Sequence, residues 1–242
     1  MHHSGITAMF ENRYDAGRQL ADKLTDYKGK SVIVLAIPNG GVPVALGIAL
    51  ALEASEFNLI ISRKIPLPLT PEAGFGAVTD DGAVMLNEEL VREAGLTAAQ
   101  IGYQVDKVRA SILQRSLAYR KELPPPVIAG KTVVIVDDGL ASGYTMMAAV
   151  KSVRARRPRE VIAATPVASG PAAGKVEITA KLVTCAVGNS SRFYVADYYR
   201  LWNEPNDAEV LQCFKEWRLR RQPAIITGRT ARNQDRPYPR QR

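Results

Sequence analysis

The sequence lacks any long hydrophobic run. Its apolar stretches are interrupted by proline, glycine or charged residues before they reach the roughly 18 residues that a membrane-spanning helix needs. Residues 1–9 also lack the hydrophobic core of a secretion signal. These absences predict a cytoplasmic protein with no membrane partner.

Cysteine is scarce as well. The chain has 2 cysteines, Cys185 and Cys213, which lie far apart and do not have the spacing of a metal site. Isolated cysteines in a globular domain behave as small apolar residues. We therefore expect two buried free thiols.

Lysine is missing from residues 218–242, although this segment is strongly basic. It contains eight arginines and one acid, and so holds +7 of the net charge of +8. The segment has neither helical nor strand periodicity, and we interpret it as a disordered, solvated tail. The rest of the chain carries only +1, which argues against a basic binding face, so we expect no nucleic-acid partner. The alternative is a nonspecific contact of the tail with RNA or an acidic surface.

What the sequence does contain is a hydrophobic fraction of 46%, enough for a substantial core. Strand patterns at residues 31–37, 58–62, 133–136, 160–166 and 181–187 alternate with helical patterns, the longest at residues 96–123. This alternation predicts an α/β fold with a doubly wound, mainly parallel sheet flanked by helices. Residues 63–75 contain three prolines and are expected to form a loop. Residues 77–86 are expected to form a hairpin.

We expect one domain over residues 10–217, with a flexible extension at residues 1–9 and the basic tail at residues 218–242. The last predicted helix covers residues 207–219. No internal repeat is evident.

The most informative segment, residues 133–145, reads Val-Val-Ile-Val-Asp-Asp-Gly-Leu-Ala-Ser-Gly-Tyr-Thr. Four apolar residues form a strand of the buried type, and Asp137 and Asp138 follow it directly. Ligands of α/β sheets bind beyond the carboxyl ends of the strands, and a small-residue turn entering a helix offers N–H groups to an anion. The pattern favours a sugar phosphate with vicinal hydroxyls and a divalent cation. The alternative is an ordinary strand-to-helix turn.

Two other features suit a phosphorylated ligand. Gly40 and Gly41 follow the first predicted strand, where glycine lets the backbone approach a ligand closely. Arg63 and Lys64 follow the second strand, where adjacent cations can neutralise negative charge that builds up on a leaving group. The alternatives are an ordinary helix entry and a solvated basic turn.

Residues 133–145 resemble the phosphoribosyl-pyrophosphate (PRPP) signature of the type I phosphoribosyltransferases. Over residues 10–217 the chain resembles a bacterial branch of this family, whose members often have an arginine at the position of Asn39. The motifs in register are Pro38-x-Gly-Gly-Val-Pro, Arg63-Lys64, Pro71-Glu72, Gly76-Ala77-Val78 and Asp207-x-Glu209-Val210. The resemblance implies a type I phosphoribosyltransferase fold with a small hood and a hairpin lid.

The resemblance also implies an activity: Mg²⁺-dependent transfer of the 5-phosphoribosyl group of PRPP to an unidentified base or amine, with release of pyrophosphate. The catalytic residues it implies are Asp137, Asp138, Arg63 and Lys64. The acidic pair would hold the ribose hydroxyls and would reach Mg²⁺ only indirectly, through those hydroxyls or water. The substrate-binding residues it implies are Asn39, Gly40 and Gly41 for pyrophosphate, and Gly139, Leu140, Ala141, Ser142, Gly143, Tyr144 and Thr145 for the 5′-phosphate. We also expect a homodimer.

The hood is expected at residues 187–203, which are rich in aromatic side chains. These rings either stack on a planar base or pack the last helix against the sheet. Two other functions compete with transfer. One is a regulatory module that senses PRPP or nucleotides and acts on RNA through the basic tail. The other is a hydrolase or phosphorylase of a ribose phosphate.

Overall fold

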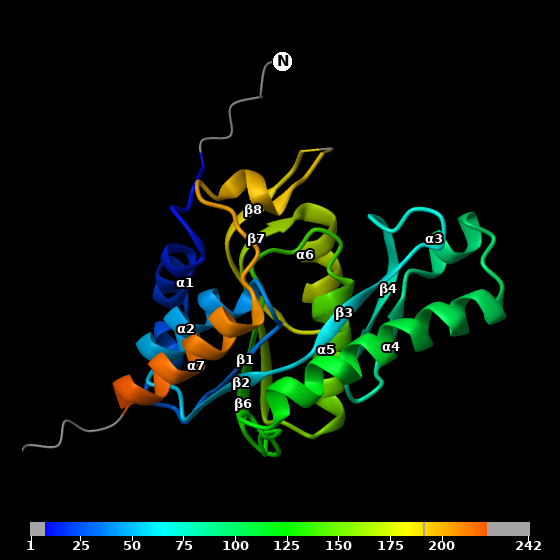
Figure 1. Ribbon diagram of the computed structural model, residues 1–242. Coiled ribbons are helices and arrows are strands. Elements are labelled where there is room, and N and C mark those ends of the chain that lie inside the picture. Colours follow the sequence, from blue (N-terminus) through cyan, green and yellow to red (C-terminus); the bar gives the residue numbers. More distant parts are fainter. Residues whose placement is uncertain (1–7, 191, 222–242) are drawn as a thin grey trace, which may run out of the picture.

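The computed structural model describes residues 8–190 and 192–221. Its central sheet has five strands in the order β2-β1-β6-β7-β8, and every neighbouring pair is parallel (Figure 1). The strands are β1 (Ile33–Ala36), β2 (Glu56–Leu59), β6 (Thr132–Val136), β7 (Glu160–Ser169) and β8 (Lys181–Gly188). The predicted parallel α/β sheet is confirmed.

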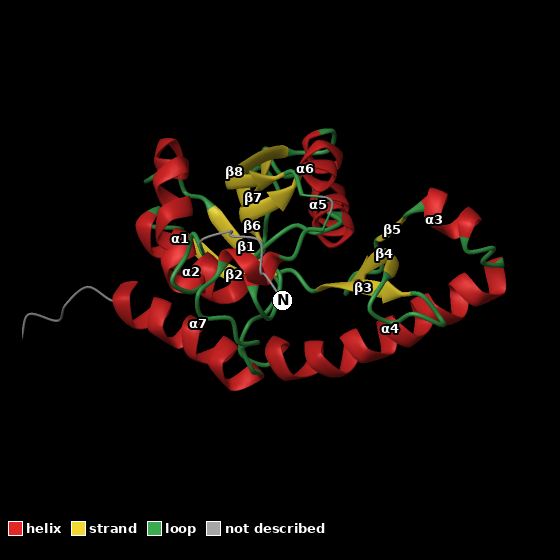
Figure 2. Ribbon diagram, turned by 90° about the horizontal axis from the view of Figure 1, so that it is seen from above, coloured by secondary structure: helices red, strands yellow, loops and turns green. Residues whose placement is uncertain are grey.

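Helices cover both faces of this sheet (Figure 2). One face is covered by α1 (Arg13–Ala21), α2 (Gly41–Ala51) and α7 (Asp207–Arg221), and the other by α5 (Tyr144–Ala155) and α6 (Gly170–Glu177). Alternate strand residues point to opposite faces. Val34 and Val134 therefore belong to the core beneath α2 and α7, while Ile33 and Val133 belong to the core beneath α5 and α6. The doubly wound arrangement is confirmed.

A second, antiparallel sheet with the order β3-β4-β5 stands beside the core (Figures 1 and 2). Its elements are β3 (Ser62–Pro66), β4 (Gly74–Thr79) and β5 (Val84–Leu86), followed by α3 (Glu88–Glu93) and α4 (Ala98–Arg120). We call β3, β4, β5 and α3 the flap. The predicted hairpin is confirmed as β4 and β5.

The prediction of an irregular loop from residue 63 onward was wrong for its first residues, because residues 62–66 form β3. Pro66 is tolerated there because β3 lies at the edge of its sheet, where a missing N–H removes no ladder bond. Helix α3 was not predicted. It begins at Asn87, whose side chain accepts a hydrogen bond from the N–H of Leu90.

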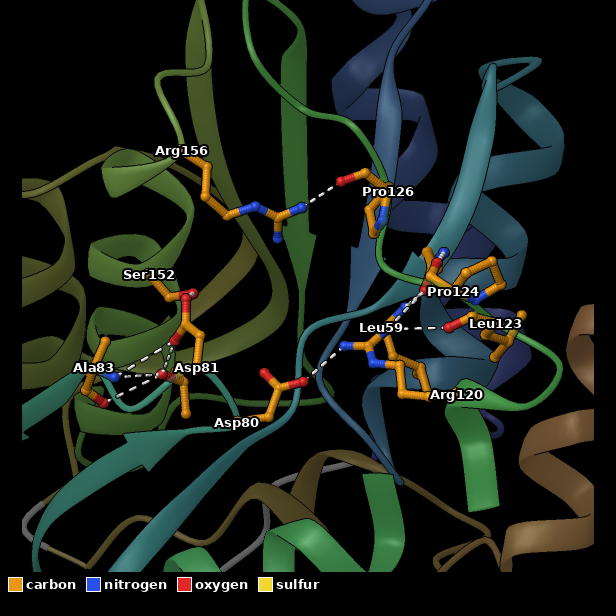
Figure 3. Close-up of polar contacts among 12 residues, drawn as sticks. Leu59, Asp80, Asp81, Ala83, Arg120, Leu123, Pro124, Pro126, Ser152 and Arg156 are labelled. Atoms are coloured by element: carbon orange, nitrogen blue, oxygen red, sulfur yellow. Dashed lines mark hydrogen bonds and ion pairs between the residues drawn. The ribbon is translucent and has the colours of Figure 1, made fainter. Parts of the chain in front are cut away.

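The flap is fixed to the core at its base by polar contacts of the β4–β5 turn (Figure 3). Asp81 accepts a hydrogen bond from Ser152 of α5 at 2.5 Å, and Asp80 forms an ion pair with Arg120 of α4 at 2.7 Å. Burial acts to raise the pKa of Asp81, but hydrogen bonds from Ser152 and Thr79 outweigh it and hold the pKa below its usual range. This turn is therefore an attachment point of the flap.

Two predicted boundaries differ from the structure. Helix α7 continues to Arg221, four residues past the predicted domain end at residue 217. Arg218 donates a hydrogen bond to the carbonyl of Glu122, and Arg221 donates one to that of Ser55. These arginines lie in the last turn, where positive charge is favoured by the helix dipole. At the other end, the N–H of Met9 already donates to the carbonyl of Tyr198. The rest of both predicted extensions lies outside the described residues.

Two further expectations from the sequence concern membrane-spanning helices and the two cysteines. Within residues 8–190 and 192–221, no helix combines the length and the apolar character needed to cross a bilayer. Both cysteines are free; Cys213 is buried, whereas Cys185 is only half-buried. The prediction of buried thiols is therefore confirmed for Cys213 and is too strong for Cys185.

Candidate functional site

The strand order places the candidate site between β1 and β6. From β1 the chain passes outward to β2, and from β6 it passes the other way to β7 and β8. Strand order thus reverses between two adjacent strands, and the loops that follow them diverge to opposite faces. In open α/β sheets such a reversal creates a crevice at the carboxyl ends of the strands, where ligands bind. The two glycine-containing loops singled out from the sequence are the loops that follow β1 and β6.

The acidic pair lies at the end of β6. The backbone N–H of Asp138 donates to the Asp137 carboxylate at 2.9 Å, and the Asp138 side chain is close enough for its charge to act on Asp137. Burial, together with the neighbouring charge of Asp138, raises the pKa of Asp137 well above its usual value. The site therefore holds one carboxyl group that resists ionisation in the ligand-free chain.

Asp138 is held by an arginine that sequence reasoning missed. Arg13 of α1 donates from Nε to Oδ2 of Asp138 at 2.8 Å, and from Nη1 to the carbonyl of Asn203 at 2.6 Å. The guanidinium lies 3.8 Å from the ring centre of Trp202, and the side chain is only 4% exposed. Arg13 thus joins α1, the hood and the acidic pair.

The aromatic residues of the hood divide into two groups. Tyr199 is buried against Phe10 and donates from its hydroxyl to the carbonyl of Asp138 at 2.6 Å. Burial is the main cause that raises the pKa of Tyr199 far above its usual value, so this hydroxyl remains a donor. Tyr194 and Trp202 keep exposed surface. In the described residues, the buried cluster of the hood joins Tyr199 to Phe10 and Ala16 and includes no residue of α7.

Other rings attach the last helix to the sheet. Phe214 of α7 stacks on Phe57 of β2 with ring centres 4.3 Å apart, and Trp217 meets the same ring edge-on. Of the two sequence-based alternatives for the hood, packing of the last helix was therefore wrong. Stacking of its exposed rings on a planar base stays a prediction.

The loop after β6 presents its backbone N–H groups. Within the described part of the chain, no acceptor is found for the N–H groups of Ala141, Ser142, Gly143, Tyr144 and Thr145. These groups lead into the N-terminus of α5, so they form a cradle suited to an anion. Gly143 has a φ of 83°, a conformation that glycine adopts without steric cost.

Leu140 has a different place in this loop. Its N–H donates to the carbonyl of Val167, its own carbonyl accepts from Ser169, and its side chain is buried. Leu140 therefore anchors the loop to β7 and leaves the neighbouring N–H groups for a ligand. Tyr144 is also buried, in a cluster with Ala77 of the flap.

The loop after β1 lies directly against the acidic pair. Its Pro38–Asn39 peptide bond is cis. The N–H groups of Asn39 and Gly40 find no acceptor among residues 8–190 and 192–221. A Cβ at Gly40 would overlap the Asp138 carboxylate, so only glycine allows this approach.

Gly40→Ala is expected to lower the free energy of unfolding by about 1–3 kcal/mol, because the added methyl group must displace Asp138 or its partner Arg13. Urea unfolding measures the change. The matched control is Gly102→Ala in α4, where no atom lies within 4 Å of the new Cβ. This control should gain about 0.5–1 kcal/mol from helix propensity. Equal effects at both positions would contradict the close approach of the loops.

Arg63 and Lys64 lie on β3, and both residues therefore belong to the flap. Arg63 donates to Ser111 of α4 at 3.3 Å, and Lys64 donates to the carbonyl of Glu72 in the β3–β4 loop. Together with Lys107, another residue that sequence reasoning missed, they line a cavity of about 310 Å³. Burial, followed by the charge of Arg115, lowers the pKa of Arg63.

The donor chemistry bears on the expected Mg²⁺. Carboxylate oxygens are the ligands that Mg²⁺ takes from proteins, usually one or two, with water and substrate phosphates completing the shell. Asp137 and Asp138 fit that limited role. Among the described residues there is no group of three or more His, Cys, Asp or Glu that could hold a metal by itself. The residues present therefore fit a cation held mainly by a ligand.

Comparison with known proteins identifies relatives of this chain. A family model described as the phosphoribosyl transferase domain matches residues 7–198. Proteins from two Mycobacterium tuberculosis strains, CDC 1551/Oshkosh and H37Rv, both named "Putative phosphoribosyl transferase", are 36% identical over 203 residues. The match covers 84% of this chain and 46% of theirs, so the chain spans about half the length of these relatives. The crystal structure of TT1426 from Thermus thermophilus is 32% identical with a TM-score of 0.72, covering 86% of this chain and 98% of that one.

Proposed function

Because this chain belongs to the type I phosphoribosyltransferase family, we propose that it transfers the 5-phosphoribosyl group of PRPP to a nitrogen nucleophile. The bond between C1 of the ribose and the pyrophosphate oxygen breaks, and a bond from C1 to nitrogen forms. The pyrophosphate leaves with the electron pair of the broken bond. The nitrogen loses a proton to solvent or to a base of the site.

The observation that carries this proposal is the meeting of two loops at one strand reversal. Asp137 and Asp138 lie between the free N–H groups of residues 141–145 and those of Asn39 and Gly40. In the proposal, residues 141–145 bind the 5′-phosphate, and the acidic pair binds the ribose hydroxyls. The loop after β1 then receives the pyrophosphate. Of the other two glycines expected to bind substrate, Gly41 donates its N–H to the carbonyl of Ile37, and a Cβ at Gly139 would overlap the side chain of Val195, so both serve close packing.

Arg63 and Lys64 stabilise the charge of the departing pyrophosphate in this proposal. Their place on β3 means that they reach the reacting group as part of the flap. Charge stabilisation by fixed donors is strongest where water is excluded. The flap therefore has two roles: it covers the reacting atoms, and it brings cations to the leaving group.

Mg²⁺ bound to PRPP would neutralise part of the pyrophosphate charge. Asp137 and Asp138 are the groups of this chain that would hold it, directly or through water and the ribose hydroxyls. Oδ2 of Asp138 already accepts a hydrogen bond from Arg13. Asp137 is therefore the carboxyl group that is more available to the cation.

The acceptor is proposed to bind beneath the hood. Tyr194 and Trp202 are exposed there, although the Arg13 guanidinium lies over the Trp202 ring, and aromatic faces suit a planar nitrogen base. The homodimer and the cytoplasmic location stay predictions.

Calorimetry with PRPP and Mg²⁺, followed by a pyrophosphate-release assay across bases and amines, tests the proposal. We expect saturable PRPP binding and release of pyrophosphate with at least one acceptor. Binding without release for every acceptor would favour the PRPP sensor, and release that needs no acceptor would favour the hydrolase. Absence of PRPP binding would contradict the proposed transfer and would leave only a sensor of other nucleotides or an enzyme that acts on another ribose phosphate.

A further inference from the structure

An arginine of helix α4 contacts the loop that follows β1. Arg115 donates from Nη1 to Oδ1 of Asn39 at 3.3 Å, although the two residues are 76 positions apart in the sequence. Arg115 lies on the same face of α4 as Ser111 and Tyr119, at four-residue spacing on either side. Ser111 contacts Arg63 of the flap, and the Tyr119 hydroxyl donates to Asp207 of α7 at 2.6 Å.

Asn39 is oriented so that it accepts from this arginine. Its amide nitrogen donates to the carbonyl of Pro205 at 2.7 Å and to Asp207 at 3.3 Å. With the nitrogen used in this way, the amide oxygen is turned toward Arg115. Asn39 is itself buried. The side-chain oxygen of Asn39 therefore binds a guanidinium that comes from another element, helix α4.

Arg63 and Arg115 are like charges that act on one another, and the more distant carboxylates of Asp207 and Glu204 offset this repulsion only in part. Both arginine side chains are half-buried. Neither has a carboxylate oxygen within ion-pair distance in the described part of the chain. Their mutual influence is visible in Arg63, whose pKa is lowered first by burial and then by the charge of Arg115. Two partly desolvated guanidinium groups held together create a demand for an anion.

We propose that Arg115 is a binding residue for the pyrophosphate group, acting together with Arg63 and the N–H groups of Asn39 and Gly40. This inference rests on the proposed function and adds a residue to it. The guanidinium comes from α4 rather than from position 39 of the loop. A diphosphate suits the arrangement, because its two phosphate groups can accept from a guanidinium and from backbone N–H groups at the same time.

The experiment compares ligands with and without the diphosphate. Arg115→Ala is expected to weaken binding of Mg·PRPP and of Mg·pyrophosphate by about 10- to 150-fold, the loss of a charge-assisted hydrogen bond. Binding of ribose 5-phosphate, which has no diphosphate, should be unchanged. Arg115→Lys keeps the charge but not the planar fork, so its loss should be smaller. Calorimetry with each ligand gives the affinities.

Two further variants test whether the effect is local. Arg109→Ala removes an equal charge from α4, but Arg109 contacts Asp106 and Gly82 instead of the Asn39 loop. This control should bind all three ligands as the parent does. In the double variant Arg115→Asn with Asn39→Arg, the guanidinium and amide exchange places, and PRPP affinity should recover at least partly relative to Arg115→Asn.

The outcomes separate this inference from the proposed function. If Arg115→Ala binds PRPP as tightly as the parent, Arg115 is not a binding residue, and the proposed function stands. If Arg115→Ala loses PRPP and ribose 5-phosphate equally, its role is structural and the inference is wrong. If the parent chain binds neither PRPP nor ribose 5-phosphate, the proposed function itself fails, and this inference fails with it.

Discussion

Asp137→Asn is expected to weaken Mg·PRPP binding about 10- to 150-fold, because the ribose hydroxyls and Mg²⁺ of the ligand favour the ionised form of Asp137, and the amide cannot take up that charge. The substitution keeps the shape of the side chain and its place at the end of β6. Calorimetry measures the affinity, and the pyrophosphate-release assay measures turnover. Full PRPP affinity in this variant would contradict the assignment of the acidic pair to the ribose.

The same variant has an expected stability signature that depends on pH. The pKa of Asp137 is raised in the folded chain by burial and by the charge of Asp138. A carboxyl group with a raised folded pKa contributes stability that is fully present below its ordinary pKa of about 4, and that is lost as the pH rises through the folded value. Asp137→Asn avoids this loss. Its stability gain over the parent in urea unfolding should therefore be large at neutral pH and should disappear in acid.

Arg13→Ala is expected to lower the free energy of unfolding by about 3 kcal/mol, which is the scale for removing one partner of a buried ion pair. Asp138, whose side chain is only 17% exposed, would lose its ion-pair partner. The contact of the guanidinium with Trp202 would also be lost. Arg18→Ala is the matched control, because Arg18 lies on the same helix but is 77% exposed. Its ion pair with Asp15 contributes at most about 1 kcal/mol.

A double-mutant cycle isolates the contact between Arg13 and Asp138. Residues in direct contact show coupling energies of about 0.5–3 kcal/mol. Arg13→Ala with Asp138→Ala should therefore be less destabilised than the sum of the two single variants. Additive effects would mean that Arg13 stabilises the chain only through its contacts with the hood.

The sequence was sufficient for the sheet and for the two loops, because their signals are local. The strand ending in Asp137 and Asp138 and the glycines that follow β1 each combine a buried strand with a turn that only small residues allow. Rules of α/β topology then place the ends of parallel strands at one edge of a sheet. Strand β3 was misassigned because its pairing with β4 compensates for the proline-rich composition that predicted a loop.

Arg13 and Arg115 were missed because their roles depend on contacts between distant segments. Arg13 is 125 residues from Asp138 in the sequence. A weak signal did exist for Arg13, since it shares the apolar face of α1 with Ala16 and Leu20, where a charge needs a buried partner. No such signal marks Arg115, which looks like one more cation on a long polar helix until the flap and the loop are placed on either side of it.

Helix α4 has a mechanical consequence that follows from its length. Its 23 residues extend about 34 Å, from the strands of the flap to the Tyr119–Asp207 contact with the core. A rigid rod of this kind acts as a lever. A flap movement that carried α4 with it would also move Arg115 relative to Asn39. The movement that opens the site would then also weaken the binding of pyrophosphate by Arg115.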